Sequence, residues 1–98
     1  MQAINTNQAP PAIGPYSQAV LSNGVLYISG QLGIDPVSGN MAEGFEEQAN
    51  RVFANLKAIL EAAGMSFRNV VKASVFLLDM NNFAALNEIY ARNFSSPF

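Results

Sequence analysis

The sequence contains no cysteine, no histidine and no tryptophan among its 98 residues. Without cysteine there are no disulfide bonds and no thiol chemistry. Histidine is the usual acid–base group near neutral pH and a common metal ligand, so its absence excludes the Ser-His-Asp and Cys-His nucleophile schemes. The acidic residues show no metal-ligand spacing and no two-carboxylate pattern. We therefore expect no metal site.

Charged residues are also scarce, at 12% of the chain, whereas 50% is hydrophobic. Globular domains usually carry about 25% charged residues. A chain of this length forms one domain, residues 1–98, and hides a smaller fraction of its surface than a larger protein does. We therefore expect self-association, because interfaces are poor in charge. A compact monomer with an apolar surface is the alternative.

The few basic residues are spread along the chain without a cluster. They are Arg51, Lys57, Arg68, Lys72 and Arg92. Nucleic-acid binding normally needs a basic patch, so we expect no nucleic acid as partner. No apolar run approaches the roughly 18 residues of a membrane span, and no signal peptide is visible. The sequence predicts a cytoplasmic protein that does not bind a membrane.

The first part of the chain is predicted to form a β-hairpin. Residues 17–22 and 25–31 have the apolar patterns typical of strands. Asn23-Gly24 between them favours a two-residue turn with positive φ. A short edge strand is predicted around residues 3–6.

The second part predicts helix, strand and helix. Residues 45–63 show an apolar stripe at steps of three and four, and Gly64 is the predicted C-terminal cap. Residues 69–78 are nearly all apolar, which predicts a strand buried on both faces. Residues 83–94 predict a second helix capped by Asn81. The order indicates an α+β sheet whose last strand has no neighbour in this chain.

Tyr16 is the first candidate for chemistry. It follows Gly14-Pro15, which favours a fixed entry angle, so its phenol can donate to a carboxylate or an imine nitrogen. Alternatively, it is a strand aromatic with its hydroxyl on a backbone carbonyl.

The other candidates are polar or glycine residues at apolar elements. Ser29-Gly30-Gln31 ends a predicted strand, where glycine marks either the approach of a ligand or an ordinary bulge. Asn87 interrupts the predicted apolar stripe of the second helix, which is formed by Phe83, Leu86, Tyr90 and Phe94. If buried, its amide must be hydrogen-bonded, either to a ligand or neighbouring subunit or to local backbone.

Several motifs in order resemble the RidA/YjgF family of reactive-intermediate imine deaminases, from about Ala3 to Phe98. The motifs are Ile13-Gly14-Pro15-Tyr16-Ser17-Gln18-Ala19, Ile28-Ser29-Gly30-Gln31, Asp35-Pro36 with Gly39, Val70-Val71-Lys72 with Val75-Phe76-Leu77, and Phe83 with Asn87 and Tyr90. The resemblance implies a chorismate-mutase-like α+β fold and homotrimers around a barrel of sheets, with ligand clefts between subunits.

The activity implied is hydrolysis of 2-aminoacrylate/2-iminopropanoate and 2-iminobutanoate to 2-keto acids and ammonia, without a cofactor. Tyr16 would be catalytic, and Ser29, Gly30, Gln31 and Asn87 would bind the substrate. The family continues past a segment like Ser96-Pro97-Phe98 into strands that carry a carboxylate-binding arginine and a water-positioning glutamate. Neither is present in this sequence, which is therefore expected to lack the closing strands.

Arg92 and Glu88 are expected on the exposed face of the second helix, where they cannot substitute for that pair. Two other functions stay open. One is a non-catalytic small-molecule-binding or regulatory role, and the other, less favoured by the charge distribution, is a translation-inhibitor or ribonuclease role.

Overall fold

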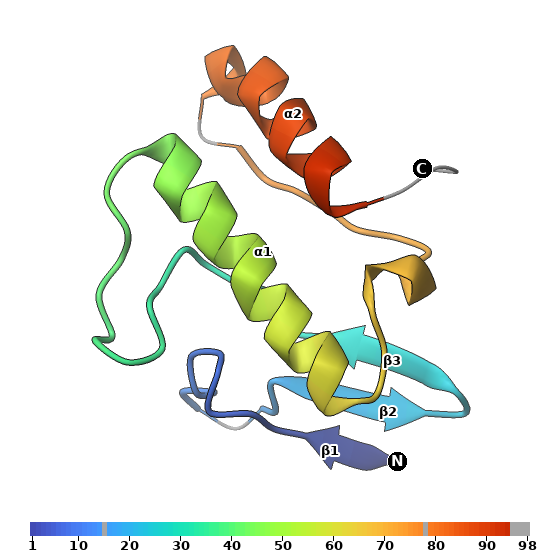
Figure 1. Cartoon of the computed structure of the whole chain (residues 1–98). Helices are drawn as coiled ribbons and strands as arrows, with labels where there is room; N and C mark the ends of the chain where they lie inside the picture. The colour runs from blue at the N-terminus through green and yellow to red at the C-terminus, as the bar shows by residue number, and fades with distance from the viewer. Residues whose placement is uncertain (15, 78, 95–98) are drawn as a thin grey trace.

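The computed structural model describes residues 1–14, 16–77 and 79–94. It contains a three-stranded antiparallel sheet in the order β1-β2-β3, made of β1 (Gln2–Ile4), β2 (Ala19–Ser22) and β3 (Val25–Ile28). Figure 1 shows these strands at the base of the molecule, with the helices to one side. The α+β fold class is confirmed.

The hairpin forms as predicted. Strands β2 and β3 pair from Ala19↔Ile28 to Ser22↔Val25, and the turn residues Asn23 and Gly24 have φ of 51° and 76°. Both angles lie in the left-handed region that asparagine and glycine tolerate best. The regular ladder is shorter than predicted. Beyond Ala19, the Ser29 amide donates to the Gln18 carbonyl and the Ser29 hydroxyl donates to the Ser17 carbonyl.

Helix α1 (Phe45–Ala62) crosses one face of the sheet (Figure 1). Gly64, which has φ of 73°, follows the end of the helix. Its amide donates to the Glu61 carbonyl, and the Met65 amide donates to the Leu60 carbonyl. This is a Schellman cap, so the predicted role of Gly64 is confirmed. The helix buries Ile59 completely against Ile4, Ala9 and Ala19, which forms the first core cluster.

The two faces of the sheet differ because side chains alternate along a strand. Ala19, Leu21, Leu26 and Ile28 pack toward α1. Val25 and Tyr27 lie on the other face and are exposed.

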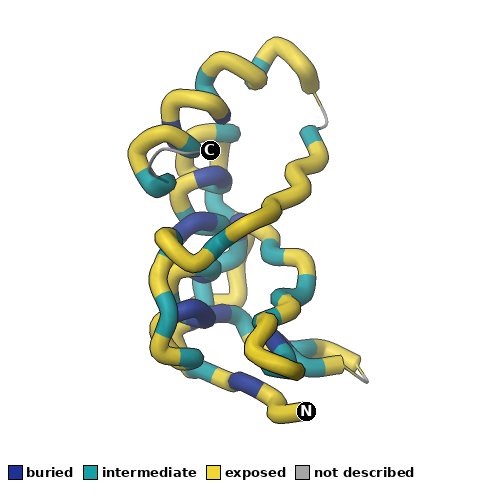
Figure 2. The backbone as a smooth tube through the Cα atoms, turned by 90° about the vertical axis from the view of Figure 1, so that its right-hand side faces the viewer, coloured by how far each residue is buried: buried dark blue, intermediate teal, exposed yellow. Residues whose placement is uncertain are grey.

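Helix α2 (Phe83–Asn93) packs on α1, and its core cluster contains no residue of the sheet. The cluster joins Ala49 and Phe53 of α1 to Leu86 and Ile89 of α2. Figure 2 shows buried positions along these helix–sheet and helix–helix contacts, with much of the connecting chain exposed. Within the described ranges, no helix has the length and apolarity needed to cross a membrane.

Two expectations about the second part were wrong. Asn81 does not cap α2; it lies in a 3-10 turn (Met80–Asn82), where Asp79 accepts from its backbone amide. Residues 70–77 form no strand: they run without regular pairing, with Val71 at 98% and Phe76 at 94% exposure. A strand needs a partner for its backbone groups, and no neighbouring strand pairs with this segment in the described chain. Leu78 lies outside the described residues.

Candidate functional site

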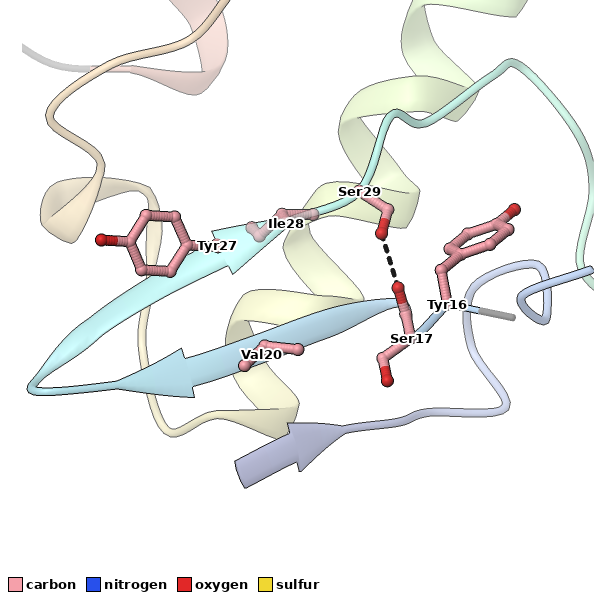
Figure 3. A pocket seen from close by; sticks show the side chains of 6 residues that line it. All are labelled: Tyr16, Ser17, Val20, Tyr27, Ile28 and Ser29. Carbon is pink, nitrogen blue, oxygen red and sulfur yellow. Dashed lines mark hydrogen bonds between the residues drawn. The ribbon is translucent and has the colours of Figure 1, made fainter. Parts of the chain in front are cut away.

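A cavity of about 420 Å³ opens at the end of the hairpin away from its turn. Figure 3 shows Tyr16 and Ser29 at one side of it and Tyr27 at the other. It is lined by Tyr16, Ser17, Val20, Tyr27, Ile28 and Ser29. Phenol and hydroxyl groups thus share a wall with aliphatic side chains, a mixture typical of small-ligand sites.

Tyr16 is held by its own loop and is 54% exposed. Its backbone amide donates to the Gly14 carbonyl at 2.9 Å, and Gly14 has φ of 111°, which other residues rarely adopt. Its phenol oxygen accepts a long 3.5 Å hydrogen bond from the Ile13 amide. Among the described residues no acceptor bonds the phenol proton, so the phenol can donate to a ligand.

Ser29 has both of its donors engaged. Its hydroxyl donates to the Ser17 carbonyl at 2.5 Å, and its amide donates to the Gln18 carbonyl at 3.0 Å. The lone pairs of the hydroxyl oxygen remain as acceptors toward the cavity. A ligand N–H group and a ligand acceptor can thus be met by Ser29 and Tyr16 respectively.

Gly30 and Gln31 follow directly in the chain but do not line this cavity. Gly30 is exposed, and a Cβ there would meet nothing within 4 Å. The Gln31 side chain donates to the Ser29 carbonyl at 3.2 Å. They extend the polar edge that begins at Ser29.

Asn87 is not brought to this cavity. It is exposed on α2, where Leu86 and Ile89 face the core instead. Asn87 is not buried, because α2 turns Leu86 and Ile89, three apart on one face, toward α1. Phe83, which was assigned to the predicted apolar stripe, is half exposed, and Glu88 and Arg92 are exposed as expected.

The sequence analysis missed two buried amides that hold the loops. Gln18 lies directly before β2, and its side chain forms hydrogen bonds with the N-terminal arm, residues 6–10. Asn55 of α1 is completely buried and donates to the carbonyls of Leu32 and Ile34, while its oxygen accepts from Arg51. A polar residue within an apolar stripe was the available signal for Asn55.

Gly33 brings the same loop against α1. A Cβ at this position would lie 2.7 Å from the Gln48 Cα, so only glycine fits without a shift. This close approach and the Asn55 bonds fix the chain just after Gln31.

The loop that follows is closed by Asp35, whose carboxylate accepts from the Val37 and Ser38 amides. Hydrogen bonds from the backbone amides of Ser38 and Val37 lower the pKa of its carboxyl. The described residues include no group of acidic side chains arranged to hold a metal ion.

A short antiparallel sheet with helices on one face and a hydroxyl-lined cavity at its hairpin defines a small α+β ligand-binding fold. Residues 6–98 match the family described as Endoribonuclease L-PSP. The chain belongs to this family, which includes the proteins called RidA and YjgF, and the predicted membership is confirmed.

Three relatives illustrate the similarity. The 2-iminobutanoate/2-iminopropanoate deaminase of goat (Capra hircus) is 53% identical over 96 residues, which covers 97% of this chain and 70% of the relative. The crystal structure of RidA from an Antarctic Psychrobacter superposes with a TM-score of 0.96 at 52% identity, covering 100% of this chain and 80% of that one. TdcF of E. coli, solved with bound serine, gives 0.90 at 39% identity, covering 94% and 72%.

Proposed function

We propose that this protein hydrolyses reactive 2-imines and their 2-enamine tautomers, including 2-iminopropanoate and 2-iminobutanoate, to 2-keto acids and ammonia. One observation carries the proposal: a phenol with an unengaged proton lies beside the Ser29 hydroxyl in a chain 53% identical to a protein named for this activity. The bound serine of TdcF supports a ligand of amino-acid size.

The reaction needs water to add to the imine carbon, forming a carbinolamine. In this addition the nitrogen gains one proton from the water. The carbinolamine hydroxyl then loses its proton and the nitrogen gains a second one, so that the C–N bond breaks, ammonia leaves and the carbon keeps the oxygen as a ketone. We assign Tyr16 to this proton and water handling, because its phenol lies beside Ser29 in the cavity and no described acceptor engages its proton. Ser29, Gly30 and Gln31 would bind the substrate along the adjoining edge.

We further propose that the working form is a homotrimer. The exposed apolar side chains of the sheet face, including Val25 and Tyr27, support burial against another copy of the chain. In such an assembly Asn87 would meet the cavity of a neighbouring subunit. We assign no catalytic role to Arg92 or Glu88. We also propose a cytoplasmic location.

The test is release of keto acid from imines generated in situ by an amino-acid oxidase. Purified, folded and assembled protein should speed formation of 2-oxobutanoate above the rate in buffer. Folded, assembled protein that gives no acceleration would contradict the proposal. Binding of an amino acid or keto acid without turnover would indicate a binding or regulatory role instead.

The family description also names an endoribonuclease. The scattered basic residues and the absence of histidine do not favour that role. Cleavage of RNA by this chain, with binding that weakens steeply as salt rises, would replace the present proposal.

A further inference from the structure

Gln18 makes an unusual number of hydrogen bonds for one side chain. It is 3% exposed and lies two residues after Tyr16. Its Oε1 accepts from the Thr6 amide at 2.7 Å, and its Nε2 lies 3.1, 3.2 and 2.8 Å from the carbonyl oxygens of Thr6, Ala9 and Pro10. The side chain thus supplies the hydrogen bonds that a neighbouring strand would otherwise give to the arm, residues 6–10.

The backbone of Gln18 connects the arm to the cavity. Its carbonyl accepts from the Ser29 amide at 3.0 Å. A single residue therefore fixes the arm on one side and the end of β3 on the other. Figure 3 shows Tyr16 between these two pieces of chain.

The arm lies next to the phenol of Tyr16. A second cavity of about 460 Å³ lies on the arm side of Tyr16, lined by Asn5, Thr6, Asn7, Pro11, Ala12, Tyr16 and Gln18. The chain leads from the arm to Ile13, whose amide donates to the phenol oxygen. If the arm moves, this weak contact is the first to be lost, because at 3.5 Å it has little strength of its own.

We propose that Gln18 is a positioning residue for the deamination: its side-chain amide fixes the arm and thereby the Tyr16 phenol relative to Ser29. This inference rests on the proposed function. Only a neutral amide suits the position, since it needs one acceptor and two donors together. Ionised glutamate has no donor, and methionine offers neither group.

The first test compares Gln18→Glu with Gln48→Glu. Gln48 is a matched control because its side chain also donates to a loop carbonyl, that of Ala42 at 2.9 Å, away from Tyr16. At about pH 8 the Gln18→Glu variant should lose on the order of tenfold in kcat, and the loss should shrink toward about pH 5.5 as the buried carboxyl gains a proton. The Gln48→Glu activity, relative to the unmodified protein, should not change with pH. Parallel pH dependence in both variants would overturn the inference.

The second test is a double-mutant cycle. Gln18→Met should lower kcat more than it raises KM, but in a Tyr16→Phe background it should cost less than about twofold, because the group it positions is gone. Equal losses in both backgrounds would mean that Gln18 supports the fold only, and would overturn the inference.

The third test does not depend on turnover. Amide hydrogen exchange at Ile13 and the NMR signals of the Tyr16 ring should change in Gln18→Met while the α1 amides keep their protection. Unchanged Ile13 and Tyr16 signals would contradict positioning. If the unmodified protein shows no turnover, the proposed function fails, and this measurement still decides whether Gln18 places the phenol.

Discussion

Two parts of the folded molecule differ in whether their backbone groups find partners: the first is the sheet with α1, and the second is the segment from residue 70 to the end of α2. In the first part, the hairpin and α1 close around Ile59, which is fully buried, and two side-chain amides hold the loops. In the second part, α2 rests on α1, while Val71 and Phe76 are almost fully exposed. The hairpin carries its own pairing partner two residues away. A single strand cannot form until another chain segment satisfies its backbone groups.

The largest effect expected is on stability, and two substitutions distinguish the packed α1–α2 cluster from the exposed residues 70–77. Phe53 packs edge-on against Phe67, Tyr90 and Phe94 at centroid distances of 5.8–6.2 Å, so Phe53→Ala should lower the free energy of unfolding by about 3–5 kcal/mol. Phe76→Ala removes the same group from an exposed position and should change it by less than about 0.5 kcal/mol. Chemical denaturation checks both. A large loss in Phe76→Ala would mean that the assembled protein covers this segment.

The next effect tests the amide that holds the loop after β3. Asn55→Ala leaves the Leu32 and Ile34 carbonyls without their donor and should cost about 1–3 kcal/mol. Asn50 lies exposed on the same helix, so Asn50→Ala should cost nothing. Urea melts of the two variants at one protein concentration make the comparison. Equal midpoints would show that the buried bonds contribute no net stability.

Substitutions of two glycines near the site should differ in their effect on stability. Gly33→Ala places a Cβ 2.7 Å from the Gln48 Cα and should cost about 1–3 kcal/mol, because backbone must move. Gly30→Ala meets open space, so its stability should stay within about 0.5 kcal/mol. Thermal unfolding distinguishes them. If Gly30→Ala lowers activity while its stability is unchanged, Gly30 belongs to the ligand edge.

Much of the first part was predictable because its signals are local. Asn23-Gly24 determines the turn, and the spacing within residues 45–63 predicts α1 to within one residue of its observed end at Ala62. Tyr16 and Ser29 could be placed near one another because the hairpin pairs their flanking residues.

The errors come from interactions that are distant in sequence. Residues 69–78 have the composition of a buried strand, but no segment of the described chain pairs with residues 70–77. The face of α2 that packs depends on α1, so Ile89 was missed and Phe83 was assigned wrongly. The hydrogen bonds of Gln18 to residues 6–10 could not be predicted, because that arm has no periodic sequence pattern.

The smallest effect expected concerns pH. Because the pKa of Asp35 is lowered from its ordinary 3.8 by the Ser38 and Val37 amides, its contribution to stability is complete above that value and is lost as pH falls through the folded pKa. Asp35→Asn should therefore flatten the acid side of a plot of melting temperature against pH below about 4, with little change at neutral pH. An unchanged acid limb would show that these amide bonds do not favour the ionised form.

The central claim is that the cavity beside the hairpin deaminates imines through Tyr16. The most direct measurement is the rate of 2-oxobutanoate release from 2-iminobutanoate by the assembled protein and by Tyr16→Phe at equal concentration. The account predicts acceleration by the unmodified protein and a loss of about 100-fold in kcat in the variant, with the fold retained. A variant as active as the unmodified protein would contradict the role assigned to the phenol.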